Sequence, residues 1–263
     1  MGGALTALSL TYCDSFGGES SPSTSDDDDG GQADDASNEA LPGPEPEPLD
    51  PGTDGPPLPP LPEGGCMDAA LSESFDTSFL TSWSTTASDG GSVALDVSAA
   101  VSPPSSLRAQ VSSAPSGFAF AGRRTCPATG VLACTFSLRV DTVADGGDIG
   151  IVDLRGKANG GGYAVARVKA RELMFLTPGE AGQQVDRTPI DLLSEPRGQF
   201  RKMDIELTSS TLVLKVEGKV LGAMSVPAAG FSLEEVRTGV LYMSGARTPG
   251  WDLRIDDLGC AWR

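Results

Sequence analysis

The sequence predicts an all-β protein, built as an antiparallel sandwich or barrel and preceded by a disordered, acidic and Pro-rich tail. Two observations support this prediction. From Leu71 onward, apolar and polar residues alternate in short segments, and Gly- or Pro-containing turns separate these segments at the spacing typical of antiparallel sheets. Before residue 66, in contrast, acidic residues and prolines accumulate and the alternation is absent.

Charge is distributed unevenly along the chain. The 263 residues contain 36 Asp+Glu and 19 Lys+Arg, which gives a formal net charge of −17 at pH 7. Residues 1–65 contain 14 acidic residues, 11 of the 20 prolines and no base, because the first basic residue is Arg108. Residues 66–263 therefore hold 22 acids against 19 bases, and this segment is long enough for one β-sandwich.

The composition argues against several functional classes. A net negative chain without a basic cluster is not expected to bind nucleic acid, because that binding depends on Lys and Arg that neutralise phosphates. The absence of His removes Ser-His-Asp and Cys-His catalysis and the His-containing zinc sites. No apolar run reaches the roughly 18–20 residues of a membrane-spanning helix, so none is expected.

The first residues resemble the signal segment and lipobox of a bacterial lipoprotein. A mildly apolar run, Gly2–Tyr12, ends at Cys13, with Leu10 three positions before the Cys, and a Ser-, Gly- and Asp-rich stretch follows. The resemblance implies that residues 1–13 are a signal-like segment and that Cys13 is lipidated. The protein would then be extracytoplasmic and lipid-anchored to the bacterial cell envelope. The alternative is a disordered start with an incidental Cys.

Residues 14–65 predict a disordered tether. The segment contains Asp26–Asp29 and alternating prolines, and almost nothing in it can be buried, so the entropy cost of ordering it would not be compensated. Alternating prolines favour the extended polyproline II conformation, which suits a spacer. The alternative is a PxxP ligand for a partner, at Pro57–Pro60 or Pro59–Pro62.

Two hairpins are predicted in the folded segment. TLVLKV and KVLGAMSV flank a two-residue turn at Glu217-Gly218, and YAVARVKA and ELMFL turn near Ala170–Glu172. Other strands are predicted at SVALDVS, SSLRAQVS, GFAFAG, VLACTFSLRVDTV, DIGIVDLR, FRKMDIELT, TGVLYMS and WDLRIDDL. Trp83 and Trp251 fall where these patterns predict burial.

Three segments resemble the concanavalin A-like lectin/glucanase fold in its laminin-G-like bacterial form. They are SESFDTSFLTSW, FRKMDIELTSSTLVLKVEGKVL and GWDLRIDDLGC. In that superfamily the opening strand carries a Phe-Asp pair and a Trp, and the last strand often ends in Asp-Asp before an apolar residue. The resemblance implies that residues 66–263 form an antiparallel two-sheet jelly-roll sandwich. It implies no activity, because the fold serves lectins, hydrolases, lyases and spacers alike.

The cysteines support an oxidising compartment. If Cys13 is lipidated, four Cys remain, an even number that is typical of disulfides. The first and last strands of a jelly roll are commonly neighbours, which implies a Cys66–Cys260 bridge across the domain ends. Cys126 and Cys134 flank a short loop and are expected to pair locally. The alternatives are free buried thiols or a metal site, although the spacing matches no zinc pattern.

The sequence lacks the catalytic signature of the glucanases that share this fold. Those enzymes carry a run resembling E-x-D-x-x-E, in which alternate carboxylates face the cleft. The best match, Asp204-Ile205-Glu206, lacks the third carboxylate, because position 209 is Ser. We therefore expect no catalytic residue here, and we expect Lys202, Asp204 and Glu206 to form the solvent face of a strand.

A structural Ca²⁺ is a further implication of the resemblance, because an acid near the end of such jelly rolls often helps hold one beside the first strand. The candidate ligands are Asp76, Asp256 and Asp257. The alternative is that one of the two adjacent Asp residues faces solvent and the other accepts hydrogen bonds from backbone N–H groups or an Arg. No other cofactor is expected.

Three residues are candidates for glycan binding. Tyr163 follows the flexible Gly160–Gly162 segment and could stack on a sugar face, and Arg123 and Arg124 could attract an anionic glycan. The alternatives are a Gly-rich hairpin loop that needs no ligand and a solvated Arg pair.

These expectations combine into a monomeric, non-catalytic lipoprotein that binds a glycan or a cell-envelope protein. The alternatives are a divergent carbohydrate-active hydrolase or lyase, and a structural envelope module without a small ligand. An enzyme needs at least two carboxylates about 5–10 Å apart in a cleft. A lectin needs exposed aromatic rings and planar polar groups on one face, and a structural module needs neither.

Overall fold

The computed structural model describes residues 71–76, 82–113, 117–128, 130–158, 161–179, 182–194, 197–244 and 248–263. The predicted lipidation site Cys13, the tether 14–65 and Cys66 lie outside these residues. Within the described ranges, no helix is long and apolar enough to cross a membrane.

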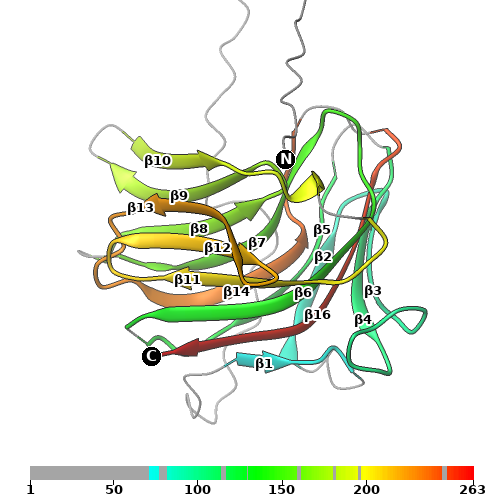
Figure 1. Cartoon of the computed structure of the whole chain (residues 1–263), viewed down its shortest axis with the longest axis horizontal. Coiled ribbons are helices and arrows are strands. Elements are labelled where there is room, and N and C mark those ends of the chain that lie inside the picture. The colour runs from blue at the N-terminus through cyan, green and yellow to red at the C-terminus, as the bar shows by residue number, and fades with distance from the viewer. Residues whose placement is uncertain are drawn as a thin grey trace, which may run out of the picture. The chain divides into compact units, whose positions relative to one another are not determined.

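Two antiparallel sheets, sheet A and sheet B, face each other across a common core (Figure 1). The strands of sheet A lie in the order β13 (Lys219–Ser225), β12 (Thr211–Val216), β11 (Arg201–Leu207), β6 (Leu132–Thr142), β16 (Trp251–Trp262), β4 (Ser106–Val111) and β3 (Gly91–Asp96), with β1 (Leu71–Glu73) also beside β16. The strands of sheet B lie in the order β10 (Gly182–Pro189), β9 (Glu172–Gly179), β8 (Tyr163–Lys169), β7 (Asp148–Lys157), β14 (Ser232–Val240), β5 (Ala119–Arg124) and β2 (Ser84–Ala87), with β15 (Met243–Ser244) beside β7. A short 3₁₀ helix, η2 (Leu192–Ser194), precedes β11. The predicted two-sheet antiparallel sandwich is confirmed.

The core consists of the inward-facing residues of both sheets. Along β12, for example, Leu212, Leu214 and Val216 are buried while the alternate residues are partly exposed, as the period of two requires. Trp83 and Trp251 are buried, as predicted. Full burial of a large apolar side chain contributes about 1.5–3 kcal/mol each, so this continuous core is the main stabilising element of the sandwich.

Both predicted hairpins are present. Strands β12 and β13 pair in register from Val216↔Lys219, and the turn residues Glu217 and Gly218 have φ values of 49° and 77°. Positive φ at both central residues is the type I′ geometry, whose twist matches that of the two strands. Strands β8 and β9 form the second hairpin, with Val168 opposite Leu173.

Three parts of sheet B are not predicted by the alternation of the sequence, and the first is the short strand β2, which reads STTA. Strand β10 lies at the edge of the sheet and reads GQQVDRTP, a polar segment whose pairing with β9 is set by backbone hydrogen bonds. The first half of β14 reads SLEEVR, and a register shift between Leu233 and Glu235 interrupts its alternation where it pairs with β7. In sheet A, the opening strand predicted at SFDTSF is not found over the described residues 74–76, and β1 lies just before it.

The predicted cysteine pairing is wrong. Strands β1 and β16 are neighbours, as expected, but Cys260 bonds to Cys134 of β6, which lies directly opposite on the other side of β16 with a Cα–Cα distance of 4.0 Å. Antiparallel register thus brings together two residues that are 126 positions apart. Because Cys134 bonds Cys260, the predicted pairing of Cys126 with Cys134 is overturned as well, although Cys126 is itself disulfide-bonded.

Candidate functional site

A row of long side chains crosses the outer face of sheet B, the face that points away from the core. Five residues, one on each of five neighbouring strands from β10 to β14, lie opposite one another in register: Arg187, Met174, Arg167, Asp153 and Arg237. Their strand neighbours along the chain, such as Val152, Leu154 and Val236, belong to the core. The alternation of each strand therefore places this row on the outer surface.

Asp153 lies at the centre of the row and is fully buried. Arg167 of β8 donates two hydrogen bonds to its carboxylate, at 2.8 and 2.9 Å, and Arg155 of β7 donates two more, at 3.1 and 3.2 Å. One carboxylate therefore holds two guanidinium groups in fixed orientations. Burial alone would raise the pKa of Asp153, but the charges and hydrogen bonds of Arg167 and Arg155 outweigh it and lower the pKa, so Asp153 is ionised near neutral pH.

Aromatic rings surround this pair of guanidinium groups. The Arg167 guanidinium lies over the ring of Tyr242, 3.9 Å from its centroid, and Arg155 donates a hydrogen bond to the Tyr242 hydroxyl. Arg237 of β14, which pairs with Glu235, lies 5.1 Å from the centroid of Phe120. Two guanidinium groups of this face, those of Arg167 and Arg237, therefore lie against a ring.

Tyr163 forms the most accessible aromatic part of this face. It begins β8 on the same side of the strand as Arg167, and 39% of its surface is exposed. Partial burial raises the pKa of its phenol despite the nearby Arg155, so the hydroxyl stays protonated near neutral pH. It can therefore both donate and accept hydrogen bonds.

The same face carries an excess of positive charge. Its outward-pointing bases are Arg124, Lys157, Arg155, Arg167, Lys169, Arg187 and Arg237. The acids on this face or paired with these bases are fewer: Asp148, Asp153, Glu172, Glu234 and Glu235. An excess of cations on one face of a chain with net charge −17 is a local feature that requires an explanation.

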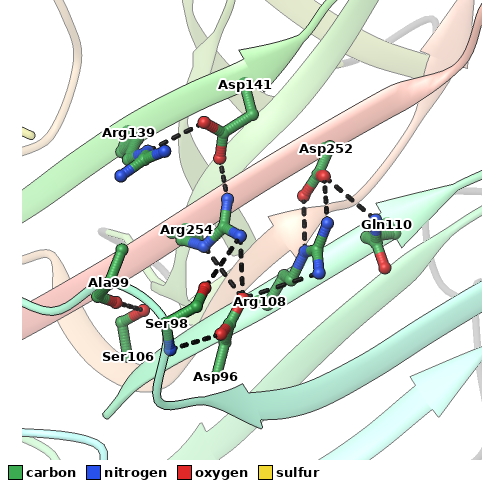
Figure 2. Close-up of polar contacts among 10 residues, drawn as sticks. All are labelled: Asp96, Ser98, Ala99, Ser106, Arg108, Gln110, Arg139, Asp141, Asp252 and Arg254. Carbon is green, nitrogen blue, oxygen red and sulfur yellow. Dashed lines mark hydrogen bonds and ion pairs between the residues drawn. The ribbon is translucent and has the colours of Figure 1, made fainter. Parts of the chain in front are cut away.

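The outer face of sheet A carries a second cluster of Arg and Asp (Figure 2). Arg108 of β4, Arg254 of β16 and Arg139 of β6 lie opposite one another in register. Each is paired with at least one acid of the same face: Arg108 makes a bidentate pair with Asp252, Arg254 bonds Asp96 and Asp141, and Arg139 bonds Asp141. The cluster is therefore neutral and contains no aromatic ring among the residues that Figure 2 draws.

The structure separates the two adjacent Arg residues that the sequence proposed for glycan binding. Arg124 is exposed on the outer face of sheet B, opposite Glu235 in register, and so lies on the same face as Tyr163. Arg123 points to the other side of β5 and forms an ion pair with Glu73 at 3.5 Å. Glu73 also accepts hydrogen bonds from the Trp83 indole and the Phe75 N–H, so Arg123 completes a buried structural contact.

The proposed metal ligands accept hydrogen bonds from backbone N–H groups and Ser hydroxyls. Asp256 accepts hydrogen bonds from the N–H groups of Val101 and Ser102, and the Ser102 hydroxyl bonds Asp257 at 2.6 Å. Asp76 accepts a hydrogen bond from Ser74. Among the described residues, no three His, Cys, Asp or Glu side chains gather as a metal site would require, and the Ca²⁺ site stays a prediction.

The predicted solvent face of β11 is confirmed. Met203, Ile205 and Leu207 are buried, whereas Lys202 lies beside Asp204, and Glu206 pairs with Lys215 of β12. Sequence reasoning missed the Asp153 cluster because its members come from three segments. The available signal was the pattern DLR in β7 and ARV in β8, in which charged residues occupy alternate positions of strands whose other residues are apolar.

These observations define an antiparallel β-sandwich with a cationic, aromatic outer face. No protein-family model and no curated protein matches the chain. The structure described as "Cellulose induced protein, Cip1" is similar, with a TM-score of 0.52 and 17% identity, over 73% of this chain and 97% of that one. This likeness shows a shared fold.

Bacterial toxin structures align less well. A botulinum neurotoxin type C structure, whose title says that cell entry depends on interaction with two ganglioside molecules, has a TM-score of 0.46 and 13% identity over 69% of this chain. The binding domain of Paraclostridial Mosquitocidal Protein 1 has a TM-score of 0.44 and 12% identity over 68% of this chain. This chain spans less than half of each toxin chain, 43% and 44% respectively.

Proposed function

We propose that this protein is a non-catalytic module that binds a glycan through the outer face of sheet B. The observation that carries the proposal is the arrangement of two rings around the Asp153 cluster: Tyr163 is accessible on the same face and lies within the electrostatic range of Arg155, and Tyr242 already carries the stacked guanidinium of Arg167. Sugars present apolar C–H faces, which pack on rings, and hydroxyls, which bond planar donors such as guanidinium groups. The neutral cluster on sheet A offers neither a ring nor an excess of donors.

The ion pairing of the central carboxylates, Asp153 and Glu235, favours a binding function over glycoside hydrolysis. A glycosidase needs one carboxyl group with a raised pKa as the acid and a second as nucleophile or base. On this face the pKa of Asp153 is lowered by Arg167 and Arg155, and Glu235 is paired with Arg237. These two carboxylates, which lie at the centre of the face, orient cations, and this suits a binding surface.

The test is a glycan-array measurement with the full-length chain and two variants of one residue. Tyr163→Ala removes the ring and is expected to weaken binding about tenfold, because a lost ring contact contributes about 1 kcal/mol or more. Tyr163→Phe keeps the ring and is the matched control, with an expected loss of at most threefold. Saturable binding that Tyr163→Ala leaves unchanged would move the site away from this face, and an array without any binding would overturn the proposed function.

We also propose that the protein is an extracytoplasmic lipoprotein, anchored through Cys13 and held away from the membrane by residues 14–65. Disulfides such as Cys134–Cys260 persist in oxidising compartments, which supports an extracytoplasmic location. The measurement is metabolic labelling of the full-length chain with a radioactive fatty acid. Label that Cys13→Ala abolishes supports the anchor, and an unlabelled wild-type chain contradicts it.

A further inference from the structure

We propose that the glycan bound on the outer face of sheet B is acidic, and that its carboxylate or sulfate groups contact the guanidinium groups that Asp153 orients. This inference rests on the proposed function and specifies its ligand class. Three observations carry it: the unequal pairing at Asp153, the open edges of two guanidinium groups, and the basic residues at the rim of the same face.

The pairing at the centre leaves one positive charge without an acid. Arg155 and Arg167 share the single carboxylate of Asp153, and the next partner of Arg155 is the neutral Tyr242 hydroxyl. Arg237 and Glu235 beside them neutralise each other. A cation that has already lost most of its water to burial gains more from an anionic ligand than a solvated surface cation does.

Each of these guanidinium groups also keeps one edge open. Asp153 binds the Nε and Nη2 atoms of both Arg155 and Arg167. In the described part of the chain their Nη1 atoms make no hydrogen bond or ion pair. The Arg167 side chain is 14% exposed, so its edge is the one that a ligand reaches first, whereas the Arg155 side chain is only 5% exposed. A fixed guanidinium with free donors matches the planar geometry of a carboxylate and also binds sulfate oxygens.

The rim extends this cationic surface on both sides. Arg187 lies in the same register row, three strands from Asp153, and is largely exposed, with only a 3.7 Å contact to Glu172. Arg124 is exposed on β5 at the opposite side. Neighbouring strands lie about 4.8 Å apart, so the row from β10 to β14 spans about 19 Å, a length that suits a polymer with repeated anionic groups better than a single acidic sugar.

The experiment compares one polymer in two charge states. Polygalacturonate and its fully methyl-esterified form have the same sugar backbone, but only the first is anionic. We expect the full-length chain to bind polygalacturonate at least tenfold more tightly, and we expect raising NaCl from 50 to 500 mM to weaken this binding about tenfold. A parallel comparison of chondroitin with chondroitin sulfate shows whether carboxylate or sulfate is the preferred group.

Variants at the rim locate the contact without disturbing the core. Arg124→Gln with Arg187→Gln is expected to weaken binding of the acidic polymer at least fivefold and to leave unfolding unchanged, because both side chains are exposed. Lys202→Gln with Lys215→Gln, which removes the same number of charges from the outer face of sheet A, is the matched control and should have no effect. Equal binding of the esterified and free polymers, if lost in Tyr163→Ala, would overturn the acidic ligand but keep the glycan site. No binding to any of the polymers or to the array would overturn both.

Discussion

The outer faces of the two sheets carry the same residue types arranged to different effect. On sheet A, three Arg residues in one row are matched by Asp96, Asp141 and Asp252, and every guanidinium has its own acid (Figure 2). On sheet B, Arg155 and Arg167 share Asp153, and both also contact Tyr242. The first arrangement is complete within the protein, whereas the second leaves donors and charge for a ligand.

The difference shows that arginine content alone does not identify a binding surface. The sheet A cluster crosses β3, β4, β16 and β6, so it fixes the register of the last strand between its two neighbours. The Cys134–Cys260 disulfide joins β6 to β16 in the same sheet. Sheet A therefore has its charges paired and two of its strands joined by a disulfide, whereas the outer face of sheet B has fewer acids than bases.

The largest expected effect is the loss of the disulfide. Replacing Cys134 and Cys260 together by Ala opens a covalent link between residues 126 positions apart, and the chain-entropy model gives a loss of about 5 kcal/mol for so long a loop. Urea unfolding measures the change. If the binding site lies on sheet B alone, the variant should keep its glycan affinity within twofold of wild type despite its lower free energy of unfolding. A large loss of affinity at native conditions would show that sheet A also shapes the binding face.

The second effect contrasts the buried carboxylates. Asp153→Asn leaves two buried guanidinium groups without an anion, and we expect the free energy of unfolding to fall by about 3 kcal/mol. Asp252→Asn on sheet A affects Arg108, whose side chain is one-third exposed, and should cost about 1 kcal/mol. Denaturant unfolding of both variants at pH 7 and low salt measures the difference. Equal losses of unfolding free energy in the two variants would contradict the prediction that the more deeply buried ion pairs of Asp153 contribute more to stability.

Alternation in the sequence was sufficient to predict an antiparallel sandwich or barrel and two of its hairpins, whereas the two-sheet sandwich was an implication of the family resemblance. The turn at Glu217-Gly218 could be placed because only a Gly-containing two-residue turn tolerates positive φ at both positions. Strand β10 could not be predicted, because an edge strand with polar residues on both sides has no hydrophobic period.

The site was predicted only in part, for a reason of topology. The sequence named Tyr163 and Arg124 as candidates but did not place them on a common face; the structure puts both on the outer face of sheet B, although β5 and β8 are separated by β14 and β7. Adjacent residues of one strand point to opposite faces, and this separates Arg123 from Arg124. The pairing of Cys134 with Cys260, like the meeting of Asp153 with Arg167, depends on which strands become neighbours, and local patterns do not contain this information.

The smallest expected effect is a pH dependence within the sheet A cluster. Burial would raise the pKa of Asp96, but hydrogen bonds from Ser98 and Arg254 outweigh it and lower the pKa to about 2. A folded-state pKa below the unfolded value of about 3.9 contributes stability that is complete above pH 4 and is lost as the pH falls through 2. We therefore expect Asp96→Asn to be less stable than wild type at pH 6 and to approach it near pH 2, as measured by urea unfolding at a series of pH values.

Asp256, in the same sheet, is the control because its pKa is shifted in the opposite direction. Burial raises the pKa of Asp256 even though the N–H groups of Ser102 and Val101 lower it. A carboxyl with a raised folded-state pKa costs stability as the pH rises from about 3.9 through that pKa, since the unfolded chain releases its proton first. Asp256→Asn should therefore steepen the rise of stability with pH between 2 and 6, whereas Asp96→Asn should flatten it. The result that would contradict this prediction is a change in the same direction, in both variants, of the slope of unfolding free energy against pH. Asp96 would then behave as a buried carboxyl without ion pairs, and the sheet A cluster would not neutralise itself as its geometry indicates.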